Sequence, residues 1–333
     1  MAADPLSDLL KTVRLTGAAF FDITAQAPWA IDSPAPAQIL PKLLPGADHL
    51  MAYHVVTAGT CFAAVGADAP IALEAGDVIV LTRSQAHVMC SDPGLPADPM
   101  MPDVLEIAAA GERPYSVRCG DGPASTRLVC GYLACDARPF NPLLGSLPPV
   151  ITARDQRNDG AGWIGQLIRF AVSEAAERHA GGDSVLTRLS ELMFIDVVRR
   201  YLETLPAEQA GWLGSLRDAA IAKALSLMHS SPAHCWTIDE LAREAGVSRS
   251  VLAERFAARV GLPPMHYLAK WRMQLAAQML AGSDARIATI AASIGYDSEA
   301  AFSRAFKKMI GVSPSDWRKG GRAQAGEEVT PVG

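Results

Sequence analysis

Apolar residues recur at helical spacing in the last third of the chain. Ile287, Ile290, Ala291 and Ile294 fall on one face of a helix. Gly295 follows them directly, and glycine readily adopts the left-handed conformation in which many helices end. The pattern therefore predicts a short amphipathic helix that stops at a tight turn.

A second helix is predicted directly after this turn. Asp297 and Ser298 carry side-chain oxygens that suit the N-cap of a helix. Four apolar residues then share one face: Phe302, Ala305, Phe306 and Met309. Ser313-Pro314 predicts the start of a third helix, with serine as cap and proline at the first position. Two short helices joined by a turn, the second with a basic, small-residue outer face, are typical of proteins that enter the DNA major groove.

An internal repeat supports this interpretation. Residues 238–261, IDELAREAGVSRSVLAERFAARVG, match residues 287–311, which carry one extra residue after the central glycine. Thr237 and Glu240 have capping-box spacing at the start of the first copy, and Ser248 caps its second helix. Residues 213–228 and 265–281 predict further helices, the latter connecting the two copies. About 25 Å of connecting helix suits two recognition helices in successive major-groove faces about 34 Å apart.

Charge divides the chain into two parts. Residues 217–322 contain 15 Lys and Arg against 9 Asp and Glu, an excess of 6 positive charges. The rest of the chain contains 15 against 26, an excess of 11 negative charges. The net charge of −5 therefore hides a basic module on an acidic body. This distribution is expected of a DNA-binding domain attached to a part with a separate function.

The stretch GYDSEAAFSRAFKKMIGVSPSDWRK, residues 295–319, resembles the signature of the AraC/XylS family of transcription regulators. The resemblance implies tandem helix-turn-helix units that bind double-stranded DNA. It also implies a sequence-specific regulator rather than an enzyme. An activator that works with RNA polymerase is expected, and repression stays open as the alternative.

Nine residues face outward in the two predicted recognition helices when the apolar faces are turned inward. They are Arg249, Ser250, Ala253 and Glu254 in the first helix, and Glu299, Ala300, Ser303, Arg304 and Lys307 in the second. Either arginine can bond a guanine edge through two N–H groups or bind phosphate. Structural alternatives remain open: Glu254 can pair with a neighbouring arginine, and Arg304 with Glu299, although five positions is poor helical spacing for a pair.

The first half of the chain predicts a short helix and then many short strands. The helix covers residues 5–15, and the strands cover residues 49–57, 60–65, 70–73, 77–82, 87–90, 115–118 and 126–135. Such a series is typical of a sandwich or barrel. LEAGDVIVLTRSQAHV, residues 73–88, resembles the cupin pattern of a Gly-Asp turn that leads into a strand, with a later inward histidine. The resemblance implies a cupin-type sensing domain of the kind found in one subgroup of AraC-like regulators.

Helical periodicity returns over residues 163–179 and 184–205. The second helix has a wide apolar face that either packs on the barrel or forms a homodimer interface, and both alternatives remain open. The predicted fold class is α+β multidomain. Its parts are a cupin-like β-barrel over residues 1–150, a helical linker with possible dimerisation over 151–210, an all-α tandem helix-turn-helix domain over 211–320, and a disordered tail over 321–333.

His54, His87 and Cys130 form the candidate effector site. By the cupin resemblance, both histidines occupy positions that point into the barrel, and Cys130 lies in the strand expected to close the same sheet. Two imidazoles and a thiolate suit Zn²⁺, or place a reactive cysteine beside a cation that lowers its pKa. The expected effector is a small molecule, a metal or an oxidant. The alternative is that these side chains are simply packed and hydrogen-bonded.

A cupin metalloenzyme with a DNA-targeting tail is the competing function. It needs about three convergent histidine or carboxylate ligands around an open position. Besides the two histidines of the candidate site, the sequence offers only His49 and Glu74. Met51 and Tyr53 stand near His49, where a cupin metal site usually opens with a His-x-His pair, so inherited metal chemistry is disfavoured.

Targeting signals are missing from the pattern. No apolar segment approaches the length of a membrane span, and the N-terminal MAADPLSDLL has no basic region followed by an apolar one. The six cysteines have neither zinc-finger spacing nor the density of a disulfide scaffold. The sequence therefore predicts a cytoplasmic protein whose cysteines are mostly reduced.

Overall fold

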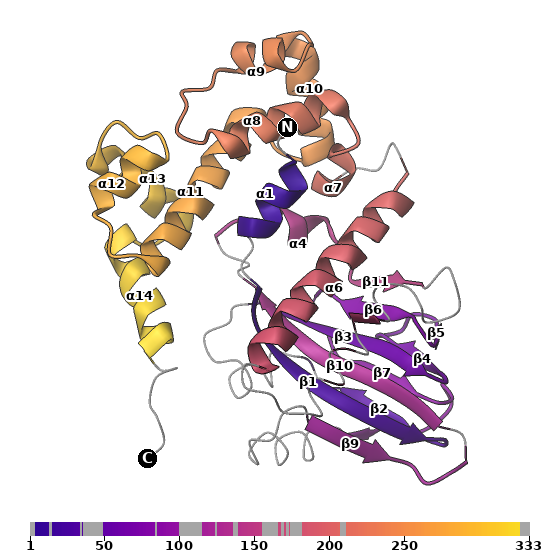
Figure 1. Cartoon of the computed structure of the whole chain (residues 1–333). Helices are drawn as coiled ribbons and strands as arrows, with labels where there is room; N and C mark the ends of the chain where they lie inside the picture. The colour runs from indigo at the N-terminus through magenta and orange to yellow at the C-terminus, as the bar shows by residue number, and fades with distance from the viewer. Residues whose placement is uncertain are drawn as a thin grey trace. The chain divides into compact units, whose positions relative to one another are not determined.

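The computed structural model forms two compact units (Figure 1). The structure describes residues 4–12, 15–33, 35, 49–83, 85–99, 115–123, 125–135, 139–154, 166–167, 170, 173, 182–206 and 211–326. The first unit, which we call the β unit, comprises Leu15–Cys135 and Pro148–Glu203. The second, the helical unit, comprises Met1–Arg14, Asp136–Leu147 and Thr204–Gly333.

Two sheets make up the β unit. One has the strand order β11-β6-β3-β10-β1-β9, and the other has the order β5-β4-β7-β2-β8. The pairs β1–β9 and β2–β8 are parallel and the other neighbours are antiparallel. The strands are β1 Leu15–Gln26, β2 Ala30–Ser33, β3 His49–Ala58, β4 Thr60–Ala64, β5 Ile71–Glu74, β6 Val78–Leu81, β7 His87–Cys90, β8 Asp98–Pro99, β9 Tyr115–Cys119, β10 Ser125–Cys135 and β11 Val150–Ala153.

One apolar core lies between the two sheets. Alternate residues of β3, among them Leu50, Ala52 and Val56, join Cys61 of β4 and Met89 of β7 in this core. Removing both inner faces from water is what stabilises such an arrangement. The predicted fold class, a cupin-like β domain followed by helices, is confirmed. Among the strands that the structure describes, the two sheets are separate and do not close into a single barrel sheet.

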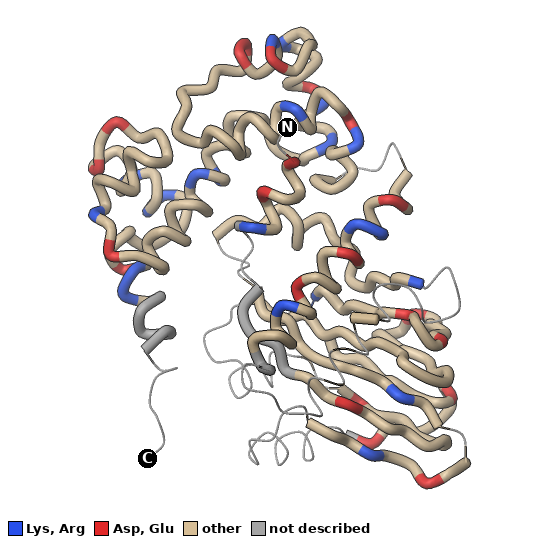
Figure 2. Tube along the Cα trace, viewed as in Figure 1, with Lys and Arg blue, Asp and Glu red and all other residues tan. Residues whose placement is uncertain are grey.

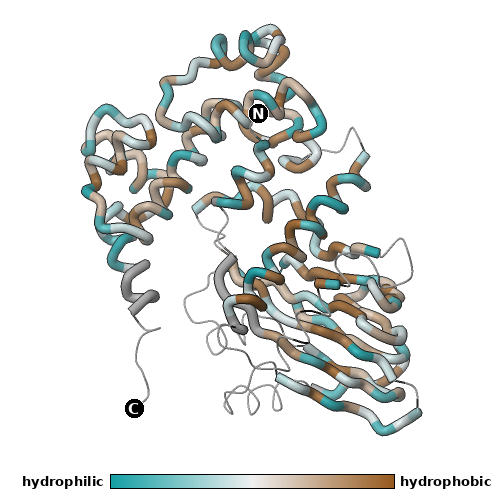
Figure 3. The backbone as a smooth tube through the Cα atoms, viewed as in Figure 1, coloured by the Kyte–Doolittle hydropathy of each residue, from teal (hydrophilic) through white to brown (hydrophobic). Residues whose placement is uncertain are grey.

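Strand β3 is buried on both faces, which explains its nearly unbroken apolar sequence. Met51, Tyr53 and Val55 alternate with the core residues and so project from the opposite face of the sheet. All three are buried. Helix α6 (Gly182–Thr204) packs on this face, where Ser190 Oγ lies 3.3 Å from Tyr53 Oη. Figure 3 shows the hydrophobic residues that run along these strands and along α6. Packing of this helix on the sheet is therefore confirmed.

The seven predicted strands are all present, and each end lies within one residue of the prediction. Strands β1, β2, β8 and β11 were not predicted. The sequence of β1, LTGAAFFDITAQ, mixes small and polar residues and lacks a strong strand pattern. Its conformation comes from tertiary pairing, since it runs antiparallel to β10 over nearly its whole length and parallel to β9. The predicted helix over residues 163–179 lies almost entirely outside the described residues.

The helical unit contains helices from both ends of the chain. They are α1 Pro5–Thr12, α4 Pro142–Ser146, α7 Trp212–Ser215, α8 Ala219–Ser230, α9 Ile238–Glu244, α10 Arg249–Val260, α11 Pro264–Gly282, α12 Ile287–Ser293, α13 Glu299–Ile310 and α14 Pro314–Gly326. Helix α1 lies against α8, and the Trp212 backbone N–H donates to Ser146 Oγ of α4 at 2.9 Å. Packing thus groups α1 and α4 with the C-terminal helices, whereas the linear division had placed both within residues 1–150.

Three helix boundaries differ from the prediction. The helix expected over residues 5–15 is α1, which ends at Thr12, and Leu15 already belongs to strand β1. The single helix expected over residues 213–228 is two helices, because Asp218 interrupts the run and caps α8 by accepting from the Ala220 and Ile221 N–H groups. Helix α14 extends to Gly326, past residue 320, where the predicted DNA-binding domain ended. Its first turn is capped at Ser313, and Trp317 anchors it to α11 through a bond to the Ala277 carbonyl. Residues 327–333 lie outside the described part.

Candidate nucleic-acid interface and effector site

Helices α9 and α10 form the first helix-turn-helix unit as predicted. Thr237 Oγ1 accepts from the Glu240 N–H at 3.1 Å, and Ser248 Oγ accepts from the Val251 N–H at 3.4 Å. Gly246 occupies the turn with a φ of 72°, a conformation that strains other residues. The N-caps at Thr237 and Ser248 and the glycine turn are therefore present, whereas the Glu240 carboxylate bonds to His234 and not back to Thr237 as a full capping box requires.

Helices α12 and α13 form the second unit with the same frame. Ser298 Oγ accepts from the Ala301 N–H at 3.2 Å and caps α13. Gly295 forms the turn with a φ of 83°, and Gly311 ends α13 with a φ of 94°. The predicted repeat is therefore a structural repeat.

Both recognition helices, α10 and α13, bury the apolar face that the sequence indicated. Leu252 and Phe256 of α10, and Phe302 and Phe306 of α13, are at most 1% exposed. The connecting helix α11 contributes residues to both cores, including Tyr267, Leu268 and Trp271 near its start and Met273, Ala277 and Leu280 near its end. Its 19 residues span about 28 Å. Figure 2 shows the Lys and Arg residues distributed over these helices.

The nine predicted DNA-contacting residues lie on the outer faces of α10 and α13. Seven are exposed, and Ala253 and Ser303 are half-buried. Arg249 Nη1 lies 3.3 Å from Asp239 Oδ2 of α9, and both side chains are exposed. In the part of the chain that the structure describes, neither Arg304 nor Glu254 takes part in an ion pair. The Arg304–Glu299 pair and the Glu254–arginine pair considered as alternatives are thus not formed.

His54, His87 and Cys130 lie together inside the β unit. Cys130 of β10 is the register partner of His54 on β3, and His87 comes from β7 of the other sheet. His54 Nδ1 lies 2.7 Å from Cys130 Sγ, and His54 Nε2 lies 2.6 Å from His87 Nε2. All three side chains are at most 5% exposed. The cupin resemblance had pointed to these residues, and the structure brings all three together.

The proton positions in this cluster follow from hydrogen-bond accounting. The Cys130 thiol donates to His54 Nδ1, His54 Nε2–H donates to His87 Nε2, and His87 Nδ1–H points toward the Gln85 carbonyl at 3.4 Å. Burial lowers the pKa of His54 well below its ordinary value and that of His87 to about 4. Burial also raises the pKa of the Cys130 thiol well above its ordinary value. The resting cluster is therefore a neutral chain of hydrogen bonds.

This geometry argues against both chemical forms considered for the site, a Zn²⁺ site and a thiolate beside a cation. His54 lies between its two partners, so the three donor atoms do not converge on one point, and Zn²⁺ does not fit this arrangement. In the described residues no group of three or more His, Cys, Asp and Glu is placed to hold a metal ion. Burial lowers the pKa of His54 and raises that of Cys130, so it disfavours a thiolate beside an imidazolium at rest.

The other two ligands considered for a metalloenzyme lie elsewhere. His49 and His54 are five positions apart on β3, so they project from opposite faces of the strand. His49 Nε2 instead bonds to the Thr82 carbonyl at 2.8 Å. Glu74 is exposed at the end of β5. Neither residue joins the cluster of His54, His87 and Cys130.

Comparison with known proteins identifies the family. Residues 4–203 match the Cupin family, and residues 241–320 match a helix-turn-helix domain family. A putative AraC-like transcription regulator of Streptomyces antibioticus is 35% identical over 325 residues, which cover 95% of this chain and 98% of the relative. Another, of Streptomyces lividans, is 34% identical over 320 residues, covering 95% and 98%. The Escherichia coli strain K12 protein named RCS-specific HTH-type transcriptional activator RclR is 31% identical over 198 residues, covering 59% and 68%.

The chain therefore belongs to the AraC-like transcription regulators, with an N-terminal cupin domain and a C-terminal DNA-binding domain. It is a DNA-binding transcriptional regulator, and the relatives above are all named as regulators rather than enzymes. Along the described residues, no helix has both the length and the apolarity that crossing a bilayer requires.

Proposed function

We propose that the chain activates transcription by binding one duplex DNA site with α10 and α13 together. The observation that carries this proposal is the structural repeat: in both helix-turn-helix units the recognition helix buries its apolar face and exposes the opposite face to solvent. Arg249 and Arg304 are the proposed base readers, and Lys307 binds phosphate. The Escherichia coli relative named as an activator supports activation, which implies contact with RNA polymerase in the cytoplasm.

The test is DNA binding by the full-length chain as a function of salt. Release of counterions from some 5–9 phosphate contacts gives a slope of log K against log[salt] of roughly −4 to −8. A duplex selected by the protein from a randomised pool should bind far more tightly than a scrambled duplex of the same composition. Equal affinity for both duplexes, or a flat salt response, would contradict a sequence-specific reader.

We further propose that the β unit senses an effector at His54, His87 and Cys130. Burying polar side chains in an apolar core costs stability that apolar side chains would not, and this hydrogen-bonded chain joins the two sheets, which supports a functional role. Among the small molecules, metals and oxidants expected from the sequence, we propose an oxidant, because His54 lies at 2.7 Å to take the thiol proton that must leave before sulfur can react. The thiolate so formed would attack a peroxide and break its O–O bond, which gives a sulfenic acid, and the proton would pass to the leaving oxygen, which departs as the alcohol or water. The His54–His87 chain would carry the thiol proton.

Titration of the purified protein with a mild peroxide and, separately, with Zn²⁺ tests this site, with DNA affinity as the readout. We expect a response to peroxide in the wild type and none in Cys130→Ser. Cys235→Ser is the matched control, because Cys235 is exposed in the helical unit and lies outside the cluster. A response to peroxide that persists in both Cys130→Ser and His87→Ala would move the effector site elsewhere.

The proposed assembly is a homodimer formed through the outer face of α6. Leu192 is 45% exposed on this face although the opposite face packs on the sheet. A large exposed apolar side chain on a helix suits contact with a second copy of the same helix. Leu192→Glu should lower the dimer fraction in sedimentation. Ala72→Glu, which adds the same charge at an exposed position of β5, should leave the dimer fraction unchanged. A monomeric wild type would rule this assembly out.

A further inference from the structure

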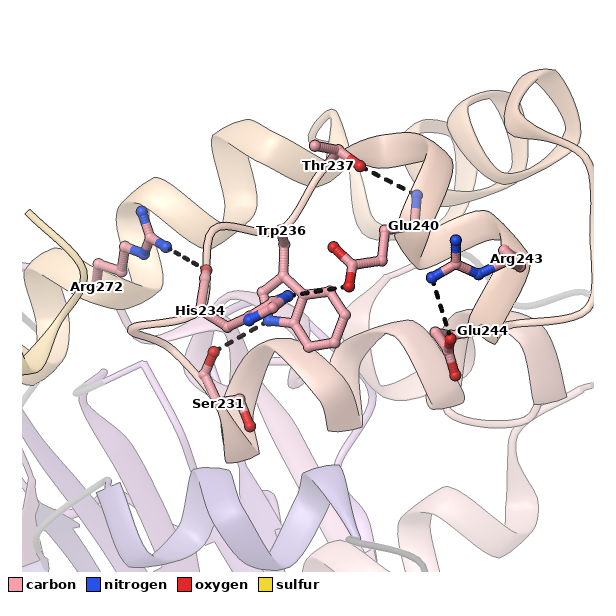
Figure 4. A network of polar contacts seen from close by, with 8 residues as sticks. All are labelled: Ser231, His234, Trp236, Thr237, Glu240, Arg243, Glu244 and Arg272. Atoms are coloured by element: carbon pink, nitrogen blue, oxygen red, sulfur yellow. Dashed lines mark hydrogen bonds and ion pairs between the residues drawn. The ribbon is translucent and has the colours of Figure 1, made fainter.

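The loop that joins α8 to α9 is held by a side chain from the connecting helix. Arg272 of α11 donates from Nε to the Pro232 carbonyl at 2.7 Å. Its Nη2 donates to the His234 carbonyl at 2.8 Å, as Figure 4 shows. Hydrogen bonds from a charged donor are about twice as strong as neutral ones. The guanidinium therefore fixes the middle of this loop, residues 231–237, to α11.

The same loop is fastened to the first helix-turn-helix unit. His234 Nε2 lies 3.0 Å from Glu240 Oε1 in the first turn of α9, and Trp236 Nε1 donates to the Ser231 carbonyl at 3.0 Å. The rings of His234 and Trp236 contact each other at a centroid distance of 4.3 Å. Figure 4 shows these side chains gathered between the loop and α9. A shift of the loop would therefore shift the start of α9.

The loop also touches the second helix-turn-helix unit, at the turn between α12 and α13. A Cβ built on Gly295 would lie 2.5 Å from the Ala233 carbonyl oxygen, so the backbone of the second turn is in direct contact with the loop. Burial raises the pKa of Tyr296, and the charge of the neighbouring Arg272 opposes part of this rise. Arg272, the loop and the turn of α12–α13 thus meet at one point.

We propose that Arg272, the loop 231–237 and Gly295 form a strut that fixes the position of α10 relative to α13. Arg272 is then a positioning residue for DNA recognition that touches no DNA itself. This inference rests on the proposed function in one respect, namely that both recognition helices bind the same duplex. Helix α11 already packs into the cores of both helix-turn-helix units, and the strut adds a second connection between them through the loop 231–237.

A rigid spacing between two readers makes binding depend on the spacing of the two DNA segments. Each base pair rotates the groove by about 34–36°, so an insertion of one base pair moves the second segment away from its helix. When two binding modules are held in the correct geometry, the second binds at high effective concentration, and this advantage is lost when the geometry is loose. The strut therefore predicts strong spacing selectivity that depends on Arg272.

The experiment compares the full-length wild type with Arg272→Ala on a duplex that the wild type selects from a randomised pool. Variants of this duplex lengthen or shorten the interval between the two protected segments by one base pair, or retain only one segment. Arg272→Ala should bind the selected duplex about tenfold more weakly, bind the single-segment duplex as the wild type does, and lose most of its spacing preference. Arg272→Lys, with one donor group in place of a fork, should be intermediate.

Two controls separate the strut from general effects. Lys270→Ala removes the same charge from the same helix, where the ammonium lies over the Phe140 ring. Arg318→Ala removes a comparable arginine-to-carbonyl bond, to Ala285, that lies inside the second unit. Both variants should keep the wild-type spacing preference.

A pair of glycine substitutions tests the other end of the strut. Gly295→Ala and Gly246→Ala place a side chain at the same turn position, with φ values of 83° and 72°. Only the first meets a neighbouring backbone, since nothing lies within 4 Å of the Cβ at Gly246. Gly295→Ala alone should broaden the spacing preference.

The outcomes distinguish the two proposals. A wild-type footprint over one segment would overturn the proposed two-helix function and the strut with it. A footprint over two segments with unchanged spacing selectivity in Arg272→Ala would overturn the strut alone.

Discussion

The two helix-turn-helix units share a sequence frame but differ in what surrounds it. Helix α9 carries three acidic residues and one arginine, whereas α12 carries no charged residue. Arg249 of the first unit is paired with Asp239, and Arg304 of the second has no ion-pair partner among the described residues. The core around α12 and α13 is apolar, while His229 lies among aromatic rings beside the first unit. The two helix-turn-helix units therefore have the same fold but differ in the charges around the recognition helix and in the polarity of the core.

The largest effect expected from this comparison concerns the equivalent residues Phe256 and Phe306. Both are fully buried, and their rings contact Tyr267 in the first case and Phe302 and Trp317 in the second. Replacing either by alanine should cost about 3–5 kcal/mol of unfolding free energy. If the cores are separate, the two costs add in the double variant, as chemical denaturation can measure. If the loss of unfolding free energy in the double variant differs strongly from the sum of the two single losses, the two helix-turn-helix units share one core and cannot be compared as separate ones.

The second prediction uses the histidine that the second unit lacks. His229 stacks on Trp271 at 4.0 Å, its Nε2 lies 2.8 Å from Tyr267 Oη, and burial lowers its pKa to about 3. The unfolded chain takes up this proton below about pH 6.5 and the folded chain only near pH 3, so stability rises with pH across that window. Acidification from pH 7 to pH 5 should cost the helical unit about 2 kcal/mol.

The measurement is denaturation at each pH, followed by fluorescence of the tryptophans in the helical unit. His229→Phe should remove this pH dependence, because the replacement keeps the aromatic stack and has no group to titrate. A wild-type curve that stays flat from pH 7 to pH 5, or a slope unchanged in His229→Phe, would contradict the assignment.

The two helix-turn-helix units could be predicted from the sequence because their caps and turns depend on residues close together in the chain. Caps such as Ser248 and Ser298, and turn glycines such as Gly246 and Gly295, act within a few residues and leave a readable pattern. The cap at Asp218 was missed because apolar residues continue on both sides of it. Strand β1 was missed because its conformation depends on partners about 100 positions away.

In the candidate sites too, features that depend on distant residues could not be predicted from the sequence. The cupin resemblance located His54, His87 and Cys130, but their protonation states depend on burial that no spacing reveals. Arg272 carried no signal, since its partners lie about 40 positions away and are backbone carbonyls, which any residue type supplies. Asp239 was also missed, because its pairing with Arg249 crosses the turn between two helices.

The third prediction ranks the two arginine readers. Arg304→Ala should weaken binding of the selected duplex by about 1–3 kcal/mol. Arg249→Ala should cost less, because Arg249 must give up its contact with Asp239 before it bonds a base. Fluorescence anisotropy on the selected duplex measures both losses, with circular dichroism as the check on folding. An equal or larger loss in Arg249→Ala would remove the proposed difference between the units.

The smallest effect is also the most direct test of why the two units differ. Asp239→Asn keeps the size of the side chain and removes the charge that holds Arg249. Both side chains are about two-thirds exposed, so their pairing is worth no more than about 1 kcal/mol. The substitution should therefore tighten DNA binding by up to about fivefold, because Arg249 is released and a negative charge near the phosphates is lost. Asp297→Asn removes an equivalent negative charge beside the second recognition helix. It therefore serves as the control for reduced repulsion of the DNA phosphates alone. The gain from Asp239→Asn should exceed this control in the wild-type background and fall to it in Arg249→Ala. If the two substitutions give equal gains in both backgrounds, the Asp239–Arg249 pair has no part in the difference between the units.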